Sequence, residues 1–96
     1  MLPPLVERAL ALSERAGFTR SCSPEAGRLL QVLAGQRGRT RVAEIGTGCG
    51  VGSAWILSAL DPHVPFVTVE LDPDCVAVAA ELLAGDERGR AARRLA

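Results

Sequence analysis

The residues best suited to bind a ligand form the glycine-rich segment Glu44-Ile45-Gly46-Thr47-Gly48-Cys49-Gly50-Val51-Gly52. Glycine at every second position lets the backbone turn tightly after a strand and approach a ligand without clashes from Cβ atoms. The N–H groups of such a loop, together with the start of the next helix, favour anionic or electron-rich groups. The alternative is a strand-to-helix turn without a ligand, although a simple turn needs only one or two glycines.

The glycine spacing differs from the fingerprint of dinucleotide-binding proteins. That fingerprint, GxGxxG, requires its third glycine at a fixed position. Counted from Gly46 this position holds Val51, and counted from Gly48 it holds Ser53. The segment therefore favours another adenosine-containing cofactor, and a nicotinamide-binding fold is a weaker alternative.

A second candidate ligand residue is Glu70, which lies 24 residues after Gly46 at the end of a predicted strand. In a parallel sheet this strand end neighbours the glycine loop, and a carboxylate there can accept hydrogen bonds from both ribose hydroxyls. A solvated strand end is the alternative interpretation. The combination with the glycine loop favours the ribose role.

Apolar periodicity and helix-capping residues predict the elements that position these groups. Ser23 before Pro24, and Asp72 before Pro73, are typical helix starts. The predicted helices cover residues 5–16, 24–34, 53–60 and 73–84, and the predicted strands cover 42–45 and 66–71. A strand–helix–strand unit with a short crossover predicts a parallel pair, which is the opening of a doubly wound α/β sheet. Trp55, on the helix after the loop, is expected in the core.

Composition excludes several classes of protein. The 96 residues suffice for one small domain, and 48% of them are hydrophobic. Eleven arginines and eleven acidic residues give a formal net charge of zero, so no net field attracts nucleic acid or an anionic membrane. The apolar runs are too short to span a bilayer, and the opening residues lead us to expect no secretory signal. The three cysteines are widely spaced, which predicts neither a zinc site nor disulfides and fits a cytoplasmic location.

Three segments in order resemble class I S-adenosylmethionine-dependent methyltransferases. Val-Ala-Glu-Ile-Gly-Thr-Gly-Cys-Gly-Val-Gly, residues 42–52, resembles motif I of that family. Val-Thr-Val-Glu-Leu-Asp-Pro-Asp-Cys, residues 67–75, resembles the motif that follows it. Ser23-Pro24-Glu25 and the leucine-rich helix after it resemble the segment before motif I in catechol and caffeoyl-coenzyme A O-methyltransferases. The resemblance covers roughly Ser23 to Leu83 and implies a Rossmann-like cofactor-binding half-domain over 23–85. The sequence pattern places an N-terminal helix and link before it, over 1–22, and an arginine-rich tail after it, over 86–96.

The resemblance also implies roles in binding S-adenosylmethionine. The loop around Gly46 would pack against the methionine part, and Glu44 would meet the cofactor amino group. Glu70 would hold the ribose hydroxyls, Leu71 would lie beside the adenine, and Ser53 would lie near the cofactor carboxylate. The implied cofactor-binding set is Glu44, Gly46, Thr47, Gly48, Gly50, Ser53, Glu70 and Leu71.

A full domain of this family is about twice as long and has a seven-stranded sheet, whose later strands carry the metal-binding carboxylates and the acceptor site. We therefore expect a shortened fold with no catalytic base and no metal site, and no methyl transfer by this chain alone. Residues 86–96 contain little β-branched sequence, so no third strand is expected there. The exposed edge of the first strand favours self-association or a missing partner half. The alternative function is a non-catalytic remnant or partner subunit.

Overall fold

The structure is a computed structural model that describes residues 1–85 and the backbone of residues 93–95. The elements follow in the order α1 (Pro4–Arg15), α2 (Pro24–Ala34), β1 (Val42–Ile45), α3 (Val51–Leu57), β2 (Phe66–Val69), α4 (Pro73–Ala84) and β3 (Arg93–Leu95). The strands form one sheet in the order β1-β2-β3, and both pairs are parallel. The predicted α/β fold with a parallel strand–helix–strand unit is confirmed.

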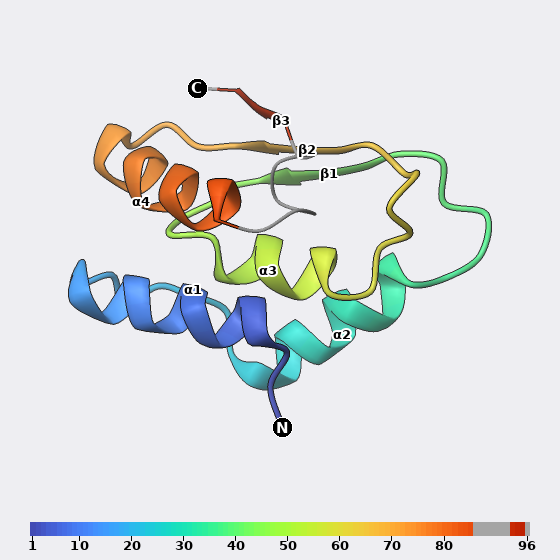
Figure 1. Cartoon of the computed structure of the whole chain (residues 1–96), viewed down its shortest axis with the longest axis horizontal. Helices are drawn as coiled ribbons and strands as arrows, with labels where there is room; N and C mark the ends of the chain where they lie inside the picture. The colour runs from blue at the N-terminus through green and yellow to red at the C-terminus, as the bar shows by residue number, and fades with distance from the viewer. Residues whose placement is uncertain (86–92, 96) are drawn as a thin grey trace.

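The hydrophobic core is built around α3. In Figure 1 the sheet lies above α3, while α1 and α2 lie below it. Trp55 is 1% exposed, which confirms its predicted place in the core. The core cluster contains Leu5, Val6, Ala9, Ala34, Val51, Ala54, Trp55, Ile56, Leu57, Leu60, Phe66, Leu82 and Leu83. Because α1 contributes to this cluster, the N-terminal helix and the strand–helix–strand unit share one core.

The predicted caps of α2 and α4 are confirmed. The Ser23 side chain accepts a hydrogen bond from the Ala26 N–H at 3.2 Å, and Asp72 accepts one from the Asp74 N–H at 2.9 Å. A proline follows each cap at the first helical position, where its fixed φ suits the helix and its missing N–H costs nothing. These caps fix where both helices begin, and α4 begins at Pro73, three residues after the predicted ligand residue Glu70.

Two predicted boundaries shift next to the glycine loop. The helix predicted over 53–60 begins earlier, at Val51, because Gly50 adopts φ +100° and serves as the N-cap. The strand predicted over 66–71 ends at Val69. Its end is set by Glu70, whose carboxylate accepts the N–H groups of Leu71 and Asp72 and turns the chain out of the sheet.

The expectation of no strand after residue 85 is wrong for Arg93–Leu95, which pairs with β2 as β3. A three-residue edge strand draws its stability from backbone hydrogen bonds to its neighbour, so composition gives no signal for it. The rest of the predicted tail, residues 86–92 and 96, lies outside the described residues. With β2 in the middle, β1 has a free edge in the described sheet.

Within the described part of the chain, every helix is too short or too polar to cross a membrane.

Candidate functional site

The glycine loop turns directly out of the sheet between β1 and α3. Gly46, Gly48 and Gly50 have φ of +86°, +57° and +100°, a region that residues with a Cβ rarely adopt. The N–H groups of Gly46 and Thr47 both donate to the Val69 carbonyl, at 2.8 and 3.0 Å. The loop is therefore fastened to the end of β2, the strand that carries Glu70.

Glu70 joins the end of β2 to the glycine loop. Its Oε1 accepts the Gly48 N–H at 2.7 Å, and its Oε2 accepts the N–H groups of Leu71 and Asp72 at 3.1 and 3.0 Å. These backbone donors, Asp72 first and Gly48 next, hold the pKa of Glu70 below its usual value. Glu70 is therefore ionised at neutral pH. Its Oε1 accepts only one hydrogen bond from the described residues, so it can accept another from a ligand.

A cavity of about 420 Å³ opens beside the loop. Its wall combines the loop, the two acids and the α1–α2 link. The lining residues are Phe18, Arg20, Ser21, Cys22, Leu30, Glu44, Gly46, Thr47, Gly48, Cys49, Val51, Gly52, Glu70 and Cys75. The structure thus brings the predicted loop and both predicted acids together around one space.

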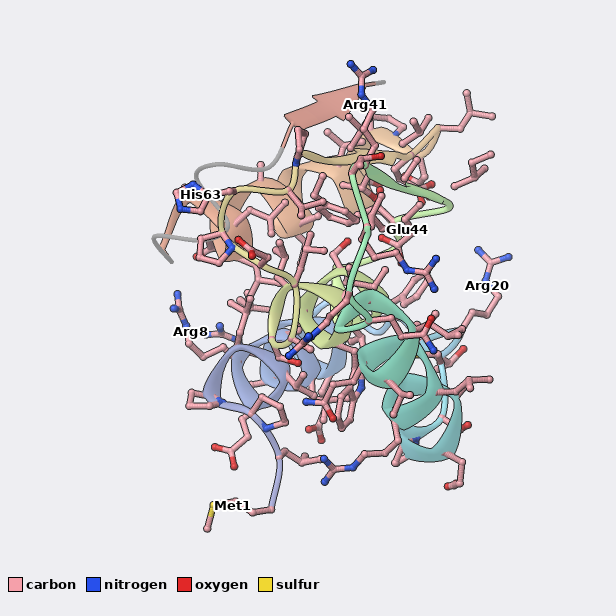
Figure 2. All side chains as sticks on the ribbon, turned by 90° about the vertical axis from the view of Figure 1, so that its right-hand side faces the viewer. Met1, Arg8, Arg20, Arg41, Glu44 and His63 are labelled. Atoms are coloured by element: carbon pink, nitrogen blue, oxygen red, sulfur yellow. The ribbon has the colours of Figure 1, made fainter. Side chains whose placement is uncertain are left out.

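The α1–α2 link is the part of the cavity wall that sequence reasoning missed. Phe18 lies over the loop, so a Cβ on Gly48 would meet its Cζ at 2.9 Å. The Arg20 guanidinium lies 5.7 Å from the centroid of the Phe18 ring, and Figure 2 shows Arg20 extending on the same side of the molecule as Glu44. The Ser21 hydroxyl is buried and has no hydrogen-bond partner among the described residues. These residues form no motif, and only the return of the chain from α1 to α2 places them here.

Glu44 is the last but one residue of β1 and is partly buried. Its Oε1 accepts hydrogen bonds from the hydroxyls of Ser53 and Thr68, at 2.5 and 2.9 Å. Burial raises the pKa of Glu44, and the two hydroxyls offset part of that rise while Glu70 adds to it. The two acids of the cavity therefore differ, because Glu70 gives up its proton at a lower pH than Glu44.

Three of the predicted binding residues lie outside the cavity lining. Gly50 is buried against α4, where an added Cβ would meet Leu82 Cδ2 at 2.7 Å. Ser53 is fully buried behind Glu44, to which its hydroxyl donates a hydrogen bond. Leu71 is 91% exposed beyond the end of β2. The other five predicted residues line the cavity, and they are Glu44, Gly46, Thr47, Gly48 and Glu70.

The three cysteines are free thiols, and all of them line the cavity. Burial raises the pKa of Cys75 to about 11 and also raises the pKa of Cys22. Both thiols are therefore protonated at neutral pH, so they act as small apolar groups in the wall. Among residues 1–85, His, Cys, Asp and Glu side chains form no group of three or more that could hold a metal ion.

The chain is similar in sequence and fold to O-methyltransferases. It is 37% identical, over 59 residues, to a protein of Mycobacterium ulcerans that is provisionally named an O-methyltransferase; the match covers 62% of this chain and 26% of that protein. Its fold matches the O-methyltransferase TomG from Streptomyces achromogenes, solved in complex with S-adenosylmethionine, with a TM-score of 0.83 and 27% identity. That match covers 98% of this chain and 43% of TomG.

A solved O-methyltransferase-like protein from Klebsiella pneumoniae gives a TM-score of 0.86 at 25% identity, covering 99% of this chain and 44% of that one. No protein-family model matches the sequence. The chain spans about a quarter of the length of the first curated relative and less than half of each solved structure. The predicted resemblance to S-adenosylmethionine-dependent O-methyltransferases is confirmed over that part.

Proposed function

We propose that this chain binds S-adenosylmethionine, or its demethylated product S-adenosylhomocysteine, in the cavity beside the glycine loop and thereby holds the methyl donor of an O-methyltransferase. The observation that carries the proposal is the hydrogen bond from the Gly48 N–H to Glu70, which joins the loop to the strand-end acid at one cavity. The complex of TomG with S-adenosylmethionine, on the same fold, supports the choice of ligand.

The polar groups of the cavity fit the charges of this ligand. S-adenosylhomocysteine carries an ammonium group, a carboxylate and two ribose hydroxyls. Glu44 would accept from the ammonium, and Glu70 would accept from the ribose hydroxyls. The Arg20 guanidinium and the Ser21 hydroxyl both line the cavity and are suitable donors to the carboxylate, and Ser21 makes no hydrogen bond to any other described residue. Gly46 is exposed, and none of the described residues lies within 4 Å of a Cβ added there, which leaves room for a ligand at the loop.

When bound, S-adenosylmethionine would supply a methyl group made electrophilic by its sulfonium. The residues of this chain would contribute orientation, since methyl transfer depends mainly on alignment of donor and acceptor. Glu44 would hold the amino-acid part of the ligand and Glu70 its ribose, and Phe18 with Arg20 would cover it from the α1–α2 link. The methyl acceptor and the complete transfer reaction are proposed only by analogy with the similar O-methyltransferases.

The proposal is tested by calorimetric titration of the folded protein with S-adenosylmethionine, S-adenosylhomocysteine and methylthioadenosine, which has the adenine and ribose but no amino-acid part. We expect binding of the first two, and weaker binding of methylthioadenosine because it lacks the contacts to Glu44. Absence of heat and of thermal stabilisation at millimolar S-adenosylhomocysteine would contradict the proposed function.

We also propose that the chain associates through the free edge of β1, with itself or with a partner. Ile45 at the end of β1 is 92% exposed, and a second cavity of about 320 Å³ lies along this strand. It is lined by Leu30, Leu33, Ala34, Arg39, Arg41, Val42, Ala43 and Ile56. An unpaired strand edge beside apolar surface favours association. The free thiols support a cytoplasmic location.

Substitution of Ile45 by lysine is expected to shift any self-associated species toward monomer, since an edge lysine opposes strand pairing. Sedimentation velocity at several protein concentrations measures the shift. Leu71→Lys is the matched control, because Leu71 is equally exposed but lies beyond β2. A wild-type protein that is monomeric at high concentration, or an equal effect of both variants, would contradict self-association through this edge.

A further inference from the structure

A chain of buried hydroxyl groups runs behind the cavity from the glycine loop to Glu44. Thr47 and Thr68 are in hydrogen-bond contact through their hydroxyl oxygens at 2.5 Å. Thr68 and Ser53 both reach Glu44 Oε1. Thr68 and Ser53 are 0% exposed. Polar side chains in so small a core are costly unless their hydrogen bonds are made, and here each hydroxyl has a partner.

The direction of these hydrogen bonds follows from the carboxylate. An ionised Glu44 can only accept, so Ser53 and Thr68 both donate their single hydroxyl protons to Oε1. Thr68 then has no proton left for Thr47, and Thr47 must be the donor in the pair. The order of donation is therefore Thr47 to Thr68 to Glu44, which joins the glycine loop to the acid through one polarised chain.

Both hydroxyls bind the same oxygen, so the other oxygen of Glu44 is left for a ligand. Oε2 has no hydrogen-bond partner among the described residues. It lies against Gly52, where an added Cβ would collide with it, and both Glu44 and Gly52 line the cavity. Without the two donors to Oε1, the side chain could rotate, and both oxygens could form hydrogen bonds with water or with other groups of the cavity wall.

We propose that Ser53 and Thr68 are positioning residues, which hold Glu44 Oε1 so that Oε2 faces the cavity and receives the ammonium group of the ligand. Thr47 extends this arrangement to the glycine loop. The inference rests on the proposed function and assigns Ser53 a role behind Glu44 in place of contact with the ligand carboxylate. The other titratable groups that act on Glu44 are Glu70 and the Cys22 thiol, and both line the same cavity.

The test compares Thr68→Val, which removes the hydroxyl at nearly constant volume, with Thr68→Ser, which keeps it. Carboxyl-carbon NMR of the ligand-free protein follows the titration of Glu44. The pKa of Glu44 is already raised, and loss of a donor to its ionised form should raise it further in Thr68→Val but not in Thr68→Ser. Ser53→Ala should act in the same direction and carries the test if Thr68→Val does not fold.

Ligand binding gives the second readout. Thr68→Val should weaken S-adenosylhomocysteine about tenfold and leave methylthioadenosine unchanged, since only the former has the ammonium group. The loss should not add to that of Glu44→Gln, because both changes act on one interaction. In wild type, affinity for S-adenosylhomocysteine should fall as the pH is lowered through the raised pKa of Glu44.

An unchanged Glu44 pKa in a folded Thr68→Val, or equal loss of both ligands, would overturn the inference. So would full additivity with Glu44→Gln. If the wild type binds neither ligand, the proposed function fails, and the NMR titration still decides whether the hydroxyls control Glu44.

Discussion

Substitution of Glu70 by glutamine is expected to lower affinity for both S-adenosylhomocysteine and methylthioadenosine by about tenfold to a hundredfold, the value of a lost charge-assisted hydrogen bond of about 1.5–3 kcal/mol. Both ligands carry the ribose that Glu70 would hold, so both should be affected. The variant also weakens the hydrogen bond of 2.7 Å from the Gly48 N–H to Oε1, which fixes the loop to the end of β2. Calorimetric titration at neutral pH measures the change.

Asp74→Asn is the control for Glu70→Gln. Asp74 is an exposed acid in the first turn of α4, so its removal changes the local charge without touching the loop. We expect Asp74→Asn to bind both ligands as the wild type does. Unchanged binding by Glu70→Gln, or a loss confined to S-adenosylhomocysteine, would remove Glu70 from the ribose site.

A single methyl group added at Gly27 is expected to destabilise the fold by about 1–3 kcal/mol, the usual cost of overpacking a core. Helix propensity alone predicts the opposite, since alanine is favoured over glycine by about 1 kcal/mol in a helix. In α2, however, the added Cβ would overlap the buried indole of Trp55, which lies against the Gly27 backbone. Urea unfolding of Gly27→Ala measures which effect dominates.

Gly38→Ala provides the comparison for Gly27→Ala. Gly38 has φ +87°, and within the described part of the chain no atom lies within 4 Å of an added Cβ, so only backbone strain of about 1–2 kcal/mol is expected there. Combining Gly27→Ala with Trp55→Phe should recover part of the loss, because the smaller ring leaves more space. A Gly27→Ala protein at least as stable as the wild type would contradict the packing of α2 on α3.

The features predictable from the sequence were those that depend on local residue types. Ser23 and Asp72 mark helix starts because a side-chain oxygen followed by proline is a local device. The glycine loop and Glu70 were predictable together because the ends of neighbouring parallel strands must meet at one edge of the sheet.

The features that the sequence did not reveal depend on long-range geometry. The wall made by Phe18, Arg20 and Ser21 arises from the packing of α1 and α2 around α3. The residues of this link show no hydrophobic periodicity from which their position could be predicted. The burial of Ser53 and its hydrogen bond to Glu44 depend on how α3 packs under the sheet, which the glycine spacing and the helix caps do not reveal. Arg93–Leu95 joins the sheet through backbone pairing, which the pattern of side chains does not predict.

The central claim is that the cavity beside the glycine loop is the binding site of the methyl donor. Backbone amide NMR of the isotope-labelled protein, titrated with S-adenosylhomocysteine, tests it most directly. The account predicts that the largest shifts fall on Gly46, Gly48 and Glu70 in the loop and strand end, and on Arg20 and Ser21 in the link. Saturable shifts confined to other surfaces, or no shifts at millimolar ligand in the folded protein, would contradict it.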